Sequence, residues 1–114
     1  MWSAYTDLSS PTEQEDEDGG AFVRVAIVGC GQISRAHISA LHEIEGLEIC
    51  AVCDRDVWRA RDIANVAGGA AAYSDLATLL QQDHPDAGHV LSPPATHAEL
   101  AIQAMEAGCH VLAE

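Results

Sequence analysis

From residue 22 onward, short runs of β-branched and other apolar residues alternate with stretches in which apolar side chains recur every three or four positions. The short runs are typical of buried strands, and the longer stretches are typical of amphipathic helices. Strict alternation of the two predicts βαβ units, in which parallel strands form one sheet and crossover helices cover both of its faces. This pattern restricts the chain to the α/β class, with a doubly wound parallel sheet of about five strands.

The expected strands are 22–28, 47–53, 71–73, 87–91 and 109–113. Four helices lie between them, each with an apolar face that is expected to pack on the sheet. In chain order those faces are Ile33, Ala36, Ala40, Leu41 and Ile44; Val57, Ala60, Ile63, Ala64 and Ala67; Leu76, Leu79 and Leu80; and Ala98, Ala101, Ile102 and Met105. Asp56 and Ser74 are expected to cap the second and third helices, and Gly46 and Gly108 to end the first and last.

The first 20 residues have a different composition, with acidic residues crowded between 13 and 18 and the pair Gly19-Gly20 after them. Their carboxylates repel one another, and too few apolar side chains are present to offset the loss of chain entropy. We therefore expect a disordered acidic tail at 1–20, followed by one folded domain at 21–114.

The charge balance limits the partners of the chain. It has 18 acidic residues against 5 basic ones, for a formal net charge of −13, and none of the basic residues is lysine. Such a surface repels nucleic acid and anionic membranes, so neither is expected as a partner. The sequence has no apolar run of membrane-spanning length and no signal peptide, which favours a cytoplasmic location with cysteines as free thiols.

A glycine-rich turn, Gly29-Cys30-Gly31-Gln32-Ile33-Ser34, follows the first expected strand and opens the first expected helix. In dinucleotide-binding proteins the first glycine of such a turn permits the tight bend, and the second lets the backbone approach a pyrophosphate. The pyrophosphate lies on the amides of the helix N-terminus, here those of Gln32 and Ile33. The small third residue, here Ser34, allows the helix to pack closely on the strand.

Asp54 ends the second expected strand 23 residues after Gly31, close to the position of an acid that binds the adenosine ribose. A carboxylate there accepts hydrogen bonds from both ribose hydroxyls and repels a 2′-phosphate, which favours NAD. Arg55 beside it, and Arg59 one helical turn further on, could instead accept the 2′-phosphate of NADP. The purely structural alternative is that Asp54 only caps a helix or lies solvated in a loop. With the glycine turn in register, the sequence predicts a Rossmann-type sheet of order 3-2-1-4-5 that binds NAD, with NADP as the alternative.

Four blocks of the sequence resemble the N-terminal domain of the glucose–fructose oxidoreductase, inositol dehydrogenase and MocA (Gfo/Idh/MocA) family. They are Val28-Gly29-Cys30-Gly31, Cys53-Asp54-Arg55, Leu91-Ser92-Pro93-Pro94-Ala95-Thr96-His97 and Ala107-Gly108-Cys109-His110-Val111-Leu112-Ala113-Glu114. The resemblance covers residues 22–114. It implies that Ser92, Pro93 and His97 lie beside the cofactor, and that Glu114 is the glutamate of a Glu-Lys-Pro motif. One departure is Gly88-His89, where the family's fourth strand continues in β-branched residues, so we expect a weaker strand there.

The resemblance also implies an activity, the transfer of hydride between a sugar or polyol hydroxyl and nicotinamide. The family's shared lysine would follow Glu114, and its second domain holds the substrate; this chain has neither. We therefore assign no catalytic residue and expect a truncated unit that binds cofactor without turnover and associates with itself through an exposed sheet edge. A different hypothesis is a dinucleotide-binding sensor that is not an enzyme. Genomic sequence downstream of codon 114 would separate the two.

Cys50 and Cys53 have the spacing of a metal or redox pair. Residues three apart on a strand are expected to point to opposite faces, so they should not hold one metal ion. We interpret them as small buried apolar side chains. The histidines other than His97 have no spacing that closes a metal site, and no metal is expected.

Overall fold

The computed structural model describes residues 23–113. The predicted acidic tail, Phe22 and Glu114 lie outside the described residues. Strands and helices alternate in the order β1 (Val23–Val28), α2 (Gln32–His42), β2 (Leu47–Cys53), α3 (Val57–Val66), β3 (Ala71–Tyr73), α4 (Leu76–Asp83), β4 (Ala87–Val90), α5 (Pro94–Glu106) and β5 (His110–Ala113). The described β4 and β5 are each one residue shorter than predicted.

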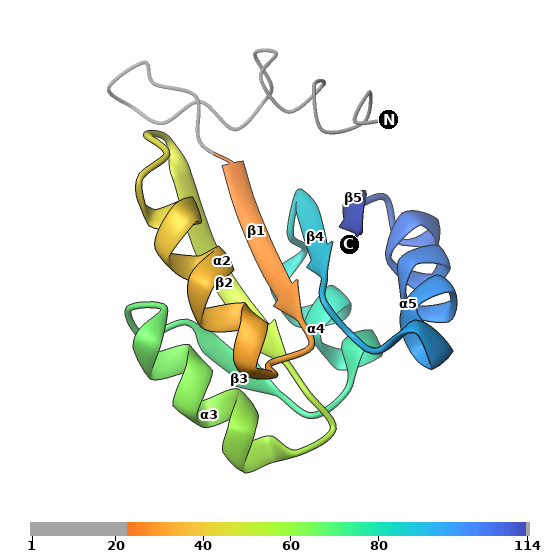
Figure 1. The fold of residues 1–114 in the computed structure, drawn as a ribbon. Coiled ribbons are helices and arrows are strands. Elements are labelled where there is room, and N and C mark those ends of the chain that lie inside the picture. The colour runs from red at the N-terminus through yellow and green to blue at the C-terminus, as the bar shows by residue number, and fades with distance from the viewer. Residues whose placement is uncertain (1–22, 114) are drawn as a thin grey trace.

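All five strands are parallel and lie in the order β3-β2-β1-β4-β5, which confirms the predicted fold class and order. Figure 1 shows α2 and α3 on the viewer's side of the sheet and α4 behind the strands. Two cores result. The first packs α2 and α3 on one face, and the second packs α4 and α5 on the other. The order of strands reverses between β1 and β4, and such a switch point opens a crevice at the carboxyl ends of the strands.

The sequence predicts most of the buried faces of α3 and α4, although Val57 of α3 is only half-buried. The predicted residues that are buried are Ala60, Ile63 and Ala64 on α3, Ala67 directly after it, and Leu76, Leu79 and Leu80 on α4. Asp56 caps α3 as expected, accepting from the backbone N–H of Trp58 at 3.0 Å. The predicted cap of α4 is wrong by one residue. Asp75, not Ser74, caps that helix, because its carboxylate accepts from the backbone N–H of Thr78 at 2.9 Å.

The predicted face of α2 is wrong except for Leu41, which is buried as expected. Ser34 and Ile38 are the other buried residues of the helix, whereas Ile33 and Ile44 are 53% and 44% exposed. The rotation of the helix is fixed at its first turn, where the small Ser34 fits against the sheet and its hydroxyl donates to the carbonyl of Gly31 at 2.6 Å. Gly46 does not cap the helix, which ends at His42; its positive φ of 81° instead turns the chain into β2.

The predicted face of α5 is wrong in part. Ala101 packs against the core as expected, but Ala104 is the buried residue of the helix, and Ile102 and Met105 are 50% and 53% exposed. Ala104 packs over Gly88 on β4, since a Cβ on this glycine would be in van der Waals contact with the Cβ of Ala104 at 3.8 Å. Gly108 ends α5 as predicted, with a φ of 92°.

The expected weakness of β4 is not apparent, because all four of its residues are buried and it pairs with strands on both sides. The ring of His89 packs edge-on against that of His37 on α2, with ring centroids 4.7 Å apart. The histidine in this strand is therefore part of the helix–sheet contact.

The spacing of Cys50 and Cys53 predicts that they point to opposite faces of the sheet, and this prediction is wrong. The register between β1 and β2 shifts at this point, since Val25 pairs with Ile49 but Ala26 pairs with Ala51. This irregularity places both cysteines in the core under α4 and α5. Burial raises the pKa of Cys50 to about 11 and that of Cys53 to about 12, so both are neutral thiols. Among residues 23–113, no group of three or more potential ligands could hold a metal ion.

Arg24 joins the start of β1 to the end of α4. Its guanidinium donates to the carboxylate of Asp83 at 3.1 Å and to the carbonyl oxygen of the same residue. Tyr73 at the end of β3 donates its hydroxyl to the other carboxylate oxygen of Asp83. These contacts fasten the end of α4 to β1 and β3. None of the helices in the described part is long and apolar enough to cross a membrane.

Candidate functional site

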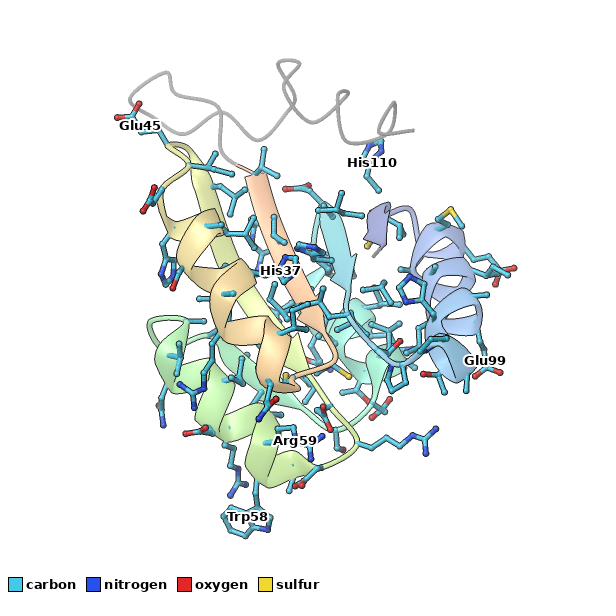
Figure 2. All side chains as sticks on the ribbon, viewed as in Figure 1. His37, Glu45, Trp58, Arg59, Glu99 and His110 are labelled. Atoms are coloured by element: carbon cyan, nitrogen blue, oxygen red, sulfur yellow. The ribbon has the colours of Figure 1, made fainter. Side chains whose placement is uncertain are left out.

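A cavity of about 600 Å³ opens at the carboxyl ends of β1, β2, β3 and β4. The turn after each of these strands contributes to its wall, as do the first turn of α4 and one face of α5. Its lining includes five residues that the sequence predicts for the cofactor site: Gly29, Asp54, Arg55, Ser92 and Pro93. Figure 2 shows Arg59 on α3 and Glu99 on α5 at this end of the molecule, and Glu45 and His110 at the other end.

Gly29 makes the contact between the turns after β1 and β4. Its φ is +99°, and a Cβ on it would lie 2.8 Å from the backbone nitrogen of Ser92 and 2.9 Å from the carbonyl carbon of Leu91. Its own N–H donates to the carbonyl of Cys53 at 2.8 Å. The first glycine of the motif is therefore required by the protein backbone around it, in both conformation and space.

Gly31 has a different environment. Its φ of −74° is available to any residue, and a Cβ on it would meet no atom within 4 Å. The space beside Gly31 is thus open, which is what the close approach of a ligand to the backbone requires.

Gly31 is the N-cap residue of α2 and provides no side chain to cap the helix, and the first turn of the helix contains no acidic residue. By contrast, α3 and α4 are capped by the carboxylates of Asp56 and Asp75. An uncapped N-terminus presents backbone N–H donors and a partial positive charge, which suit an anionic group. Gln32 and Ile33 lie in this first turn with exposed side chains, so their backbone amides are the groups available to a ligand.

Asp54 connects the glycine turn to the start of α3. Its Oδ2 accepts from the backbone N–H of Cys30 at 2.8 Å, and its Oδ1 accepts from the backbone N–H of Asp56 at 2.8 Å. The side chain is 13% exposed, and Arg59 Nη1 lies 3.9 Å from Oδ2. Asp54 is therefore not the cap of α3, a role that Asp56 fills. Each carboxylate oxygen can accept a second hydrogen bond, so both remain competent to bind vicinal hydroxyls.

Ser92 lies in the turn between β4 and α5, and His97 lies in the first turn of α5. The Ser92 hydroxyl is buried at the edge of the cavity and has no hydrogen-bond partner in the part of the chain that the structure describes. His97 Nδ1 lies 3.3 Å from the carbonyl oxygen of Ser92, so its ring contacts the turn that precedes the helix. Of the remaining predicted residues, Gly31, Gln32, Ile33 and His97 do not line the cavity, and Glu114 lies outside the described residues.

Sequence reasoning missed part of the wall. Ser74, Asp75, Leu76 and Ala77 come from the start of α4, and Thr96, Glu99, Leu100 and Gln103 come from one face of α5. The spacing of the α5 residues is helical, but only the assembled sheet shows that this face borders the turn after β2.

A parallel sheet with a cavity at its switch point, an open glycine turn on an uncapped helix and an acid at the end of β2 defines a dinucleotide-binding Rossmann domain. Residues 23–114 match the model of the oxidoreductase family with an NAD-binding Rossmann fold, GFO_IDH_MocA. The chain belongs to this family, as the sequence resemblance predicts.

Two relatives illustrate the match. D-glucoside 3-dehydrogenase from Escherichia coli (strain K12) is 39% identical over 93 residues, which are 81% of this chain and 26% of the relative. The scyllo-inositol 2-dehydrogenase (NADP(+)) IolU from Bacillus subtilis (strain 168) is 36% identical over 92 residues, with 81% and 28% covered. This chain thus spans little more than a quarter of the length of these relatives.

Solved structures agree with the sequence matches. WlbA dehydrogenase from Bordetella pertussis, in complex with NADH and UDP-GlcNAcA, superposes with a TM-score of 0.76 at 31% identity, covering 81% of this chain and 29% of that one. KijD10, a 3-ketoreductase from Actinomadura kijaniata in complex with NADP, has a TM-score of 0.74 at 32% identity, with the same coverage. The fold and the family of this chain are therefore those of NAD(P)-binding oxidoreductases.

Proposed function

We propose that the cavity at the carboxyl ends of the strands binds NAD in preference to NADP. In this proposal the pyrophosphate lies beside Gly31 on the amides of Gln32 and Ile33, and the adenosine ribose lies on Asp54. The observation that carries the proposal is the position of the Asp54 carboxylate. Its Oδ2 accepts a hydrogen bond from the backbone N–H of Cys30 in the glycine turn at 2.8 Å, and the residue lines a cavity of about 600 Å³. That volume lies within the range of small-molecule sites.

The residues of this chain bind and orient the cofactor. Asp54 couples ribose recognition to the glycine turn, because one oxygen bonds to that turn and to the sugar together. The Ser92 hydroxyl, buried beside Gly29, is placed to hydrogen-bond the part of the dinucleotide that crosses the switch point. His97 fixes the turn that carries Ser92. Glu114 is counted among the cofactor-binding residues because, by family resemblance, it is the glutamate of the Glu-Lys-Pro motif. A bound nicotinamide supplies the hydride acceptor or donor at its C4 atom.

We further propose that the longer proteins built on this domain oxidise hydroxyls of sugars or polyols, as the names of relatives such as D-glucoside 3-dehydrogenase indicate. The polypeptide of residues 1–114 should bind cofactor without turnover, because the family resemblance implies a catalytic lysine and none of these residues is lysine. Incubation of the purified chain with NAD⁺ and a panel of sugars and polyols should give no NADH above a protein-free control. NADH formation that follows the protein through purification would contradict this expectation.

The exposed edge of β5 supports a proposal of self-association. This strand is the last in the sheet, and its second edge has no paired strand among the described residues. Val111 and Leu112 on it are only half-buried. Unpaired backbone groups on an apolar edge favour pairing with a second chain.

The acidic composition supports the proposal that nucleic acid is not a partner. The four buried free cysteines support a cytoplasmic location.

Calorimetric titration of the chain with NAD⁺ tests the cofactor proposal. Asp54→Asn keeps the volume of the side chain but removes its charge and one acceptor, and it should weaken NAD⁺ binding by about 1–3 kcal/mol. Asp62→Asn is the matched control, because Asp62 is an exposed acid on α3 that pairs with Arg35 outside the cavity. Equal NAD⁺ affinity in wild type and Asp54→Asn would exclude Asp54 from the site.

A further inference from the structure

The exposed apolar residues of α2 lie together along one side of the helix. Arg35 marks the other side, because its guanidinium pairs with Asp62 on α3, whereas the ring of His37 packs against His89 on β4. Four apolar residues with exposed side chains lie on the His37 side, at spacings of three and four. They are Ile33, Ala36, Ala40 and Ile44, which together form the α2 flank. An apolar stripe of this kind is typical of a helix that packs against another element.

The α2 flank borders a face of the sheet that no helix of the described chain covers. Ala87 on β4 belongs to the core under α2 and α3, and it pairs with His110 on β5. Since side chains alternate along a strand, His110 and Leu112 lie on this side of the sheet, and Val111 lies on the side of α5. Leu112 is half-buried and belongs to neither core. Figure 1 shows β4 and β5 beside α2 with no helix in front of them.

Charge restricts how two copies of this chain can meet. The formal net charge is −13, so two copies repel each other, and a stable contact has to keep carboxylates apart. Among the four described helices, α2 is the one without an acidic residue. The α2 flank, His110 and Leu112 likewise contain no carboxylate. Two copies can therefore meet on this surface without placing carboxylates against each other.

We propose that the α2 flank and the open face of β4 and β5 bind a second copy of the chain, with the two α2 helices antiparallel. A two-fold axis makes the contact reciprocal, so that the same apolar surface is buried in both copies. The antiparallel orientation brings Ile33 of each copy next to Ile44 of the other, and it keeps Glu43 of the two copies apart. Ala36 and Ala40 between the isoleucines are small, which lets the helices approach closely. This interface differs from the edge of β5 and does not depend on the NAD site.

Sedimentation of the full chain at several concentrations tests the proposal. Wild type should show a monomer–dimer equilibrium. Ala40→Glu should weaken the dimer about a hundredfold, because the two-fold axis places both new carboxylates in one apolar contact. Ser39→Glu is the matched control, since it adds the same charge at an exposed position of the same helix outside the α2 flank. It should change the dissociation constant less than about threefold.

Cross-linking tests the orientation of the helices. Chains carrying Ile33→Cys and chains carrying Ile44→Cys, mixed under a mild oxidant, should form a disulfide between the two variants and little within either one alone. The native cysteines should not react, because burial raises the pKa of each thiol to about 11 or 12. Circular dichroism and melting curves would show that each variant folds.

The remaining outcomes would each overturn the proposal. One is a chain that stays monomeric at every concentration. Another is a dimer that Ala40→Glu leaves unchanged, which would assign association to the edge of β5. Equal weakening by Ser39→Glu would show that only net charge matters. A disulfide within the Ile44→Cys variant, formed in preference to the mixed one, would mean that the helices are not antiparallel. NAD⁺ binding enters none of these measurements, so failure of the cofactor proposal would leave this one standing.

Discussion

The two glycines of the turn after β1 should respond in opposite ways to the same substitution. In Gly29→Ala the new methyl would lie 2.8 Å from the backbone nitrogen of Ser92 in the turn after β4, and the residue would have to keep a φ of +99°. A side chain in such a conformation costs about 1–3 kcal/mol, and forcing apart packed backbone costs about 1–3 kcal/mol more. We therefore expect a total loss of roughly 2–6 kcal/mol, a large part of the stability of a small domain.

Gly31→Ala should be nearly neutral for folding. The methyl meets no atom within 4 Å and the φ of −74° is unstrained. The less favourable alanine at the N-cap is offset by the lower entropy of the unfolded chain, leaving a net change below about 1 kcal/mol. The same methyl would, however, occupy the space through which the pyrophosphate approaches the backbone. By analogy with an overpacked core, this should weaken NAD⁺ binding by about 1–3 kcal/mol.

Thermal melting without ligand and calorimetric titration with NAD⁺ measure the two effects separately. At about 4–8 °C per kcal/mol, Gly29→Ala should lower the melting temperature by roughly 10–50 °C, and Gly31→Ala by less than about 8 °C. The reasoning would be refuted by a Gly31→Ala variant that binds NAD⁺ as tightly as wild type. A Gly29→Ala variant with wild-type stability would show that the turns after β1 and β4 can separate without cost.

Three further predictions concern stability and assembly. Arg24→Met should cost about 1.5–3 kcal/mol in urea unfolding, because it removes charged hydrogen bonds to Asp83, whereas the exposed Arg61→Met should change stability by less than about 0.5 kcal/mol. The free energy of unfolding should fall as pH rises above 9, because burial raises the pKa of the thiols above the unfolded value of 9.0, to about 11 for Cys109. The folded state then retains protons that the unfolded state has lost. Cys109→Ala should make the dependence on pH less steep, and a stability that is constant between pH 9 and 11 would contradict the prediction. Sedimentation should show concentration-dependent association, and a strict monomer at all concentrations would exclude pairing through β5. In unfolding experiments, NAD⁺ at a hundredfold excess over Kd should raise the free energy of unfolding by about 2.7 kcal/mol.

The sequence could predict what depends on local pattern. Continuous apolar runs that alternate with helical periods indicate a parallel sheet covered by helices on both faces. The strand order then followed from the glycine turn, which is typical of the Rossmann type of sheet. The glycine turn and the acid 23 residues after Gly31 were likewise readable, because their spacing follows from the length of one βαβ unit. The family followed from the same blocks.

Tertiary structure decided how each element is rotated and what each polar group contacts. The faces of α2 and α5 could not be fully predicted from hydrophobicity, because small residues lie where these helices contact the sheet, Ser34 on α2 and the pair Gly88 and Ala104 on β4 and α5. A one-residue register shift placed Cys50 on the same side as Cys53, which strict alternation could not foresee.

The site divides in the same way. Sequence spacing identified Asp54 and the two glycines as residues of a dinucleotide site. Only the assembled fold showed that Gly29 is held by the protein backbone, whereas Gly31 faces open space. Only the fold showed that Asp54 is bonded to the glycine turn and lies within reach of Arg59. The physical reason is that local propensity depends on neighbours along the chain, whereas these contacts join residues 24 or more positions apart or depend on the rotation of a packed helix.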